Sequence, residues 1–165
     1  MFGLLGTLVG GLITWLGQWH SSRVERRRQE IQVQQQRADL RRQAYLRFLN
    51  SADEFQEHAR DITAVIGVGQ DGDVRRQAEE RYLLGWRQLN SCLAEAQIAG
   101  PRQVSDEAGR LYSAAAAYSN AVDSYIRETP QGNRGKAQRE SLEDAMIEAR
   151  RVFAVEARQA IDLDR

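Results

Sequence analysis

The sequence predicts an all-α protein in which an N-terminal transmembrane helix continues through a helical stalk into an up-down antiparallel four-helix bundle. Residues 2–19 form an apolar segment without a charged side chain. Residues 45–163 repeat apolar side chains at helical spacing, and no segment alternates like a β-strand. We therefore divide the chain into a transmembrane helix (1–19), a basic, polar stalk (20–44) and a bundle (45–165).

The charge and cysteine content exclude several kinds of partner and site. The 165 residues carry 23 basic and 23 acidic side chains, so the total charge gives no pull toward nucleic acid. The distribution is uneven, because residues 20–44 contain seven arginines and three acidic residues. A single cysteine, Cys92, rules out a disulfide within this sequence and a cysteine-based zinc site. We expect no nucleic-acid partner.

The N-terminal apolar segment is long enough to span a bilayer. A helix over residues 2–19 is about 27 Å long, close to the roughly 30 Å hydrocarbon core. A signal peptide would start with basic residues and end in small ones, whereas here no basic residue comes first and Trp15 and Trp19 lie near the end. An interfacial helix would need a strongly polar face. The segment therefore predicts a transmembrane helix, with a helix buried in protein as the alternative.

The residues that follow the apolar segment predict its orientation. Four arginines come directly after it and no basic residue precedes it, so the positive-inside rule places the N-terminus outside and the bundle in the cytoplasm. Two tryptophans one turn apart fit the aromatic belt, and anionic headgroups would contact the arginines. The predicted membrane-interface residues are Trp15, Trp19, Arg23, Arg26, Arg27 and Arg28.

The glycines of the apolar segment predict a helix-packing face. Small residues recur at spacings of four and three, residues 6–10 read GTLVG, and bulky side chains lie on the opposite face. Small residues let helices approach closely in lipid, which favours association with a second copy or with another membrane protein. The alternative is that the glycines are simply tolerated, as in many membrane helices. The predicted packing residues are Gly3, Gly6, Thr7, Gly10, Gly11, Thr14 and Gly17.

Residues 20–44 predict a solvated helical stalk. They contain neither proline nor glycine and many strong helix formers. Val24, Ile31, Ala38 and Tyr45 recur every seven residues, but the companion heptad positions are mostly Arg and Gln. Because a coiled coil needs apolar residues at both positions, a weak coiled coil is the less favoured alternative.

The bundle is predicted from four apolar stripes separated by turn sequences. The turns are GVGQDGD, AGPR and TPQGNRG. Short connections between helices of similar length give antiparallel neighbours. The helices are expected at residues 23–66, of which 45–66 belong to the bundle, and at 74–99, 102–128 and 136–163. The predicted core residues are Tyr45, Phe48, Leu49, Ala52, Phe55, Ala59, Ile62, Ile66, Tyr82, Trp86, Leu89, Cys92, Leu93, Ala96, Val104, Ala108, Leu111, Ala115, Tyr118, Val122, Tyr125, Leu142, Ala145, Met146, Ala149, Val152, Phe153, Ala157, Ala160 and Ile161.

Motifs that could carry chemistry find little support. Residues 67–72 spell GxGxxG, but a dinucleotide site needs a preceding strand and a parallel sheet. Asp71 and Asp73 match only a fragment of a calcium loop. His58 has no glutamate three residues before it, which excludes a di-iron motif, and Cys92 lies on a core stripe. We expect no catalytic residue, cofactor or metal ligand.

The overall layout resembles that of uncharacterised small membrane-anchored helical proteins of actinobacteria. It combines an N-terminal apolar helix, an Arg- and Gln-rich extension and the stretch QIAGPRQVSDEAGRLY within an Ala-rich helical region. The resemblance is one of layout and implies no activity. We expect a non-enzymatic, single-pass protein of the cytoplasmic membrane that presents its bundle for self-association or partner binding. The alternative is a pore-forming or membrane-permeabilising oligomer assembled through the glycine-rich helix.

Overall fold

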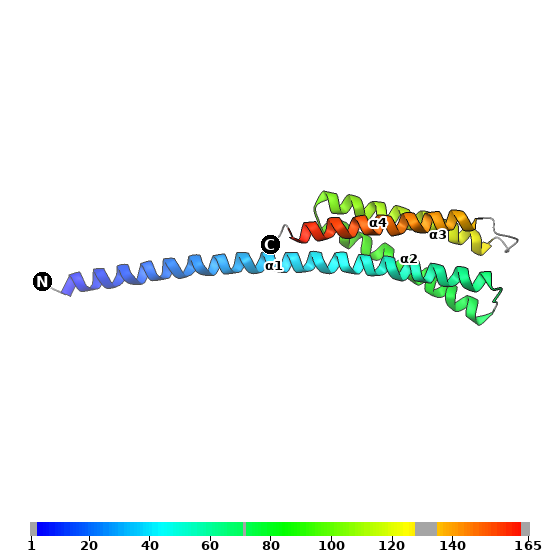
Figure 1. Cartoon of the computed structure of the whole chain (residues 1–165). Helices are drawn as coiled ribbons and strands as arrows, with labels where there is room; N and C mark the ends of the chain where they lie inside the picture. The colour runs from blue at the N-terminus through cyan, green and yellow to red at the C-terminus, as the bar shows by residue number, and fades with distance from the viewer. Residues whose placement is uncertain (1–2, 71, 128–134, 163–165) are drawn as a thin grey trace. The chain divides into compact units, whose positions relative to one another are not determined.

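The computed structural model describes the backbone of residues 3–70, 72–127 and 135–162, and the side chains of these ranges from Glu30 onward. These residues form four α-helices (Figure 1). The helices are α1 (Gly3–Gly67), α2 (Asp73–Ala99), α3 (Arg102–Arg127) and α4 (Lys136–Asp162). The predicted ends of the last three helices are therefore confirmed to within one residue. The chain divides into two units, Met1–Asp39 and Leu40–Arg165, and the second contains the bundle.

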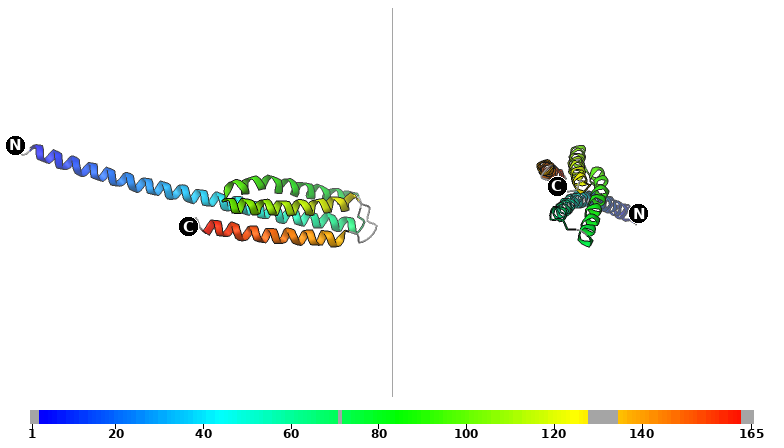
Figure 2. Two further views of the ribbon diagram at one scale, coloured as in Figure 1. Left: turned by 90° about the horizontal axis from the view of Figure 1, so that it is seen from above. Right: turned by 90° about the vertical axis from the view of Figure 1, so that its right-hand side faces the viewer.

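The second unit is an up-down four-helix bundle, and the pairing of α1 with α4 shows the antiparallel direction. Asp53 of α1 forms an ion pair with Arg150 of α4, and Arg60, two turns later in α1, pairs with Glu143, two turns earlier in α4. The helices of this unit run alongside one another (Figure 2). The architecture predicted for residues 45–165 is confirmed for its described part.

The other helix pairs follow the same antiparallel order. On α1 and α2, Arg47 pairs with Glu95 while Glu54 accepts a hydrogen bond from Gln88. The helix α3 then contacts both α2 and α4. Each helix thus packs against two neighbours, as an up-down bundle with short connections requires.

Phe55 lies at the centre of the core and links three helices. Its ring centroid is 5.7 Å from that of Tyr82 and 5.3 Å from that of Trp86, both on α2. It also meets Tyr118 of α3 in an edge-to-face contact at 6.3 Å. Such offset and edge-on aromatic pairs add to the stabilisation from burial alone. The core therefore joins α1, α2 and α3 around one fully buried phenylalanine.

Phe153 brings α4 into the same core. Its ring packs edge-on against Tyr45 at 5.9 Å and Phe48 at 5.3 Å, both on α1. Phe153, Phe48 and Met146 are completely buried. The other large side chains that are fully buried are Tyr45, Phe55, Ile62, Leu89, Leu111, Val104 and Val122.

The predicted apolar stripes are largely confirmed, with one wrong residue and several omissions. Ala145 is exposed, because α4 turns a narrow face inward through residues spaced three and four apart such as Leu142, Met146 and Phe153. Some stripe residues are only half-buried: Leu49, Trp86, Cys92, Leu93, Tyr125, Leu142, Ala149, Val152 and Ile161. Buried residues outside the predicted stripes are Ala44, Ser51, Gln56, Ala78, Gly85 and Ser119.

Two glycines permit close contacts that any larger residue would disturb. At Gly85 of α2 a Cβ atom would lie 3.1 Å from Cδ2 of His58 and 3.3 Å from Cα of Phe55, so the glycine lets α2 approach the backbone of α1. At Gly100, between α2 and α3, a Cβ atom would collide with the hydroxyl of Tyr45. Glycine therefore serves packing at both positions.

Candidate functional site

The residues predicted to act in the membrane all precede Glu30, where the described side chains begin. The backbone of residues 3–28 belongs to α1, but the side chains lie outside the described part of the chain. This applies to the packing residues Gly3, Gly6, Thr7, Gly10, Gly11, Thr14 and Gly17 and to the interface residues Trp15, Trp19, Arg23, Arg26, Arg27 and Arg28. Among the described residues, no helix is long and apolar enough to cross a membrane. The membrane assignment stays a prediction.

The GxGxxG sequence starts at the last residue of α1 and ends at the residue before α2. Gly69 has a φ of 71°, its N–H donates to the carbonyl of Ile66, and the N–H of Gln70 donates to the carbonyl of Val65. These two bonds form a Schellman motif, in which a glycine in the left-handed region ends a helix. Gly72, with a φ of 78°, directly precedes α2. Gly69 and Gly72 therefore adopt the left-handed backbone conformations that the turn between α1 and α2 requires.

His58 and Cys92 both lie at contacts between helices. The His58 ring packs beside Gly85, and its Nδ1 atom is buried without a hydrogen-bond partner among the described atoms. Cys92 is a half-buried free thiol on α2. Within the described ranges, no three His, Cys, Asp or Glu side chains gather closely enough to hold a metal ion.

Glu143 of α4 is the centre of a polar cluster that joins three helices. Gln56 of α1 donates its amide N–H to Oε1 of Glu143 at 2.9 Å, and Arg60 forms an ion pair with the same oxygen. The Glu143 side chain is only 17% exposed. Burial and the neighbouring Glu143 carboxylate raise the pKa of Tyr118 on α3 to about 12. At neutral pH the Tyr118 hydroxyl is protonated and can donate a hydrogen bond.

A second polar cluster joins α2 to α3. The Tyr82 hydroxyl donates to Oδ1 of Asp123 at 2.9 Å and lies 2.7 Å from Oγ of Ser119. Burial is the main cause that raises the pKa of Tyr82, and the Asp123 carboxylate adds to it. Both clusters bridge helices with satisfied hydrogen bonds, which fixes how the helices align. The burial of Ser119 and Gln56 could not be predicted from the sequence. Polar residues lie in a core only where a partner satisfies their hydrogen bonds, and these partners come from other helices.

A groove lies between α1 and α4 in the bundle unit. Its volume is about 320 Å³. Its apolar lining is formed by Tyr45, Leu46, Leu49, Ala154, Ala157 and Ile161. Its charged lining is formed by Arg42, Arg158 and Asp162. We call this site the α1–α4 groove; it combines an apolar interior with guanidinium groups from both helices.

A second hollow, of about 330 Å³, lies between α3 and α4. The Arg139 guanidinium stacks over the Tyr125 ring at 3.8 Å from the ring centroid, and both residues line the hollow. Such a cation–π contact occupies the face of the arginine and holds α4 against α3.

Comparisons with known proteins add no functional analogy. The chain matches no protein-family model, no curated protein and no solved structure. Four-helix bundles host many unrelated functions, so the architecture alone assigns none. The function must be argued from the residues of this chain and from their arrangement.

Proposed function

We propose that this chain is a non-enzymatic, single-pass membrane protein that is anchored by residues 1–19 and uses its cytoplasmic bundle to bind a partner or a second copy. The observation that carries the proposal is that α1 spans Gly3–Gly67. This one helix includes the apolar segment and the first helix of the bundle. A membrane-spanning segment must satisfy all its backbone hydrogen bonds internally, and a continuous helix does so.

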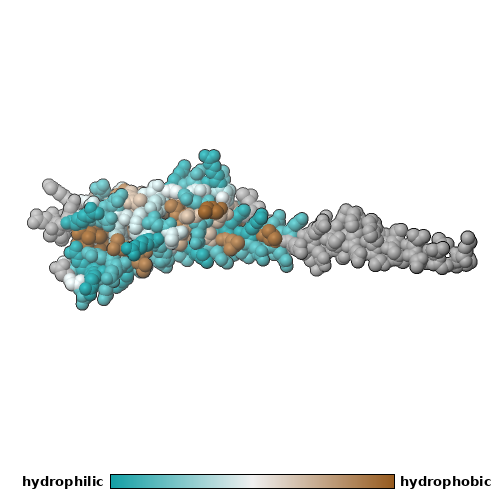
Figure 3. Space-filling model, turned by 180° about the vertical axis from the view of Figure 1, so that it is seen from behind, coloured by the Kyte–Doolittle hydropathy of each residue, from teal (hydrophilic) through white to brown (hydrophobic). Residues whose placement is uncertain are grey.

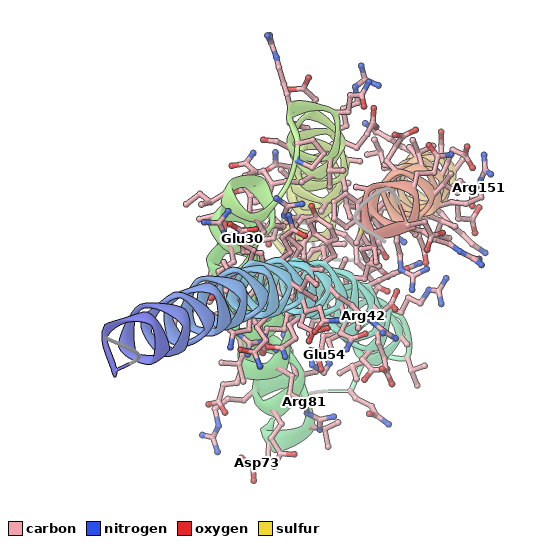
Figure 4. All side chains as sticks on the ribbon, turned by 90° about the vertical axis from the view of Figure 1, so that its left-hand side faces the viewer. Glu30, Arg42, Glu54, Asp73, Arg81 and Arg151 are labelled. Carbon is pink, nitrogen blue, oxygen red and sulfur yellow. The ribbon has the colours of Figure 1, made fainter. Side chains whose placement is uncertain are left out.

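The polar side chains that the fold gathers support a binding role for the bundle. Glu143 and Tyr82 are each engaged with partners on neighbouring helices. Other charged residues, such as Asp73, Arg81 and Arg151, lie at the periphery of the bundle (Figure 4). Hydrogen-bonded clusters between helices stabilise one arrangement of the bundle, and its charged surface remains available to partners.

The apolar surface of the bundle also supports local binding rather than one broad interface. Figure 3 shows separate apolar patches on a largely hydrophilic face. Single exposed apolar residues are ordinary on soluble surfaces, whereas large interaction sites expose contiguous patches. We therefore expect self-association to depend on the predicted membrane-helix face, and the bundle to bind through smaller features.

Extraction of membranes at alkaline pH tests the proposal. The full-length chain should stay in the membrane pellet, because only a spanning or firmly anchored protein resists this treatment. Leu12→Arg, which places a charge in the middle of the apolar segment, should move the protein to the supernatant. The control is Leu83→Arg on α2, where Leu83 is 50% exposed, and this variant should stay in the pellet. Wild-type protein in the supernatant would overturn the proposal.

Dye release from liposomes separates this function from membrane permeabilisation. An anchor leaves vesicles intact, because its helix offers no polar lining for water or ions beyond Thr7, Thr14 and Gln18. The reconstituted full-length protein should therefore release no more dye than protein-free vesicles. Release that rises with the protein-to-lipid ratio would favour the pore-forming alternative instead.

A further inference from the structure

The α1–α4 groove has the size and lining of a site for an apolar chain. Its volume of about 320 Å³ lies at the lower end of the range for small-molecule sites. Leu46 is 48% exposed, and Leu49 and Ile161 are half-buried, although all three are strongly apolar. A hydrocarbon chain in the groove would remove these side chains from water, which favours binding.

The edge of the groove carries cations from both helices. Arg42 of α1 is exposed and forms no ion pair with any described residue. On α4, Nε of Arg158 lies 3.9 Å from Oδ2 of Asp162, which is longer than a hydrogen bond, and the two side chains are 86% and 59% exposed. Because both side chains are so exposed, this ion pair holds the Arg158 guanidinium only weakly. Both arginines can therefore contact an anion.

We propose that the α1–α4 groove binds the acyl chain of an anionic membrane lipid, with Arg42 and Arg158 contacting the lipid phosphate. Guanidinium groups bind phosphate through paired hydrogen bonds, and long arginine side chains can lie along an apolar surface while their charged ends stay in water. This inference rests on the proposed function, because a membrane-anchored chain encounters the lipids that the groove would bind.

A second copy of the chain fits the groove less well than a lipid does. A stable protein interface buries about 800 Å² on each partner and has an apolar centre. The large exposed apolar residues of the bundle unit are instead spread over several helices (Figure 3). They are Leu40, Leu46, Val68, Val74, Leu83, Leu84, Ile98, Ile147 and Val155. A narrow groove with a cationic edge matches a single chain with an anionic head.

Photocrosslinking to the full-length protein tests this assignment. The protein, in a non-ionic detergent, is mixed with lysophosphatidylglycerol that carries a photoactivatable acyl chain, and the crosslinked peptides are mapped. Lysophosphatidylcholine with the same chain provides the zwitterionic comparison. Crosslinks should fall on the α1 peptide that contains Leu46 and on the α4 peptide that contains Ile161, with a higher yield for the anionic lipid.

Matched variants separate the two parts of the groove. Arg42→Gln and Arg158→Gln should each lower binding of the anionic lipid about fivefold and lower binding of the zwitterionic lipid less, because the choline cation offsets the charge of its phosphate. Leu46→Asn should lower binding of both lipids. Arg81→Gln and Leu83→Asn change residues of similar type and exposure on α2 and should alter neither. Circular dichroism checks that each variant retains the wild-type helix content.

Three results would overturn the proposal. The first is crosslinking outside α1 and α4, and the second is binding that none of the groove variants weakens. The third is a lipid-free dimer that Leu46→Asn dissociates, because that would assign the groove to a second copy. The membrane proposal is tested separately. Wild-type protein in the alkaline supernatant contradicts the membrane anchor, whereas wild-type protein that stays in the pellet but gives no crosslinks in the groove contradicts only the lipid site.

Discussion

At the scale of single residues, Glu143 shows how a charged side chain is accommodated between helices. Its carboxylate accepts a hydrogen bond from Gln56 and pairs with Arg60, while Tyr118 lies beside it. A buried acceptor that loses its partners lowers the stability of the fold. The contacts of Glu143 therefore stabilise the bundle more as a network than the sum of the separate contacts. No sequence pattern predicts this cluster, because Glu143 lies 87 positions from Gln56 and 83 from Arg60, and only the fold brings them together.

Removal of the Glu143 carboxylate should destabilise the bundle. Glu143→Ala leaves the Gln56 amide without its acceptor and should lower the free energy of unfolding by about 2 kcal/mol. Glu143→Gln keeps an acceptor for Gln56 and should lose about half as much. Urea denaturation followed by circular dichroism measures both. Glu95→Ala, which breaks an exposed ion pair with Arg47, is the control and should change stability little. Equal effects of Glu143→Ala and Glu95→Ala would contradict the role given to Glu143.

Tyr118 should make stability fall at alkaline pH. Its pKa is about 12 in the folded protein against an ordinary value of 10, so the unfolded chain releases the proton first. The contribution of Tyr118 is fully present below pH 10 and is lost as the pH rises from about 10 to about 12. Chemical denaturation between pH 8 and pH 11 should show a steeper decline for the wild type than for Tyr118→Phe. Parallel declines of the two proteins would refute this linkage.

At the scale of helices, the boundaries were predictable because local chemistry sets them. Gly69 ends α1 through its left-handed conformation, and the AGPR sequence separates α2 from α3. The apolar stripes also follow from helical periodicity. Contacts between helices do not follow from this periodicity. Ala145 fits the periodicity of α4 but faces solvent, whereas Gly85 is buried because α1 lies against it. These properties depend on the neighbouring helix, which the local sequence does not specify.

Two glycine-to-alanine substitutions should act in opposite directions. In a helix, alanine is favoured over glycine by about 1 kcal/mol. At Gly109 of α3 an added Cβ atom would meet Nε2 of Gln97 at an ordinary 3.7 Å, so Gly109→Ala should raise the melting temperature. At Gly85 the Cβ atom would lie 3.3 Å from the Phe55 backbone, which cannot move aside alone, so Gly85→Ala should lower it. Thermal denaturation compares the two variants, and a stabilising Gly85→Ala would contradict the close approach of α2 to α1.

At the scale of the whole molecule, a predicted membrane anchor and a bundle of defined architecture belong to one chain. The bundle was predictable from periodicity and turns, and the structure describes it. The α1–α4 groove was not predictable, because Arg42 and Arg158 lie 116 positions apart and their proximity follows from the pairing of α1 with α4. The anchor rests on the composition of residues 1–19.

Self-association should depend on the small residues of the apolar segment. Gly10→Leu places a bulky side chain in the GTLVG face and should reduce assembly of the full-length protein in detergent. Light scattering coupled to size-exclusion chromatography gives the molar mass of the protein component. Leu8→Ile, on the bulky face, is the control and should assemble like the wild type. If Gly10→Leu retained the wild-type molar mass, the packing face would be wrong.

Trypsin digestion of sealed membrane vesicles tests the central claim most directly. The side chains of Arg37 and Arg42 are exposed in the structure, and cleavage there separates the bundle from residues 1–19. In inside-out vesicles trypsin should release the bundle into solution, and in right-side-out vesicles the bundle should stay protected until detergent is added. Release from right-side-out vesicles would reverse the predicted orientation. A chain that is washed off both kinds of vesicle without digestion would contradict the membrane anchor itself.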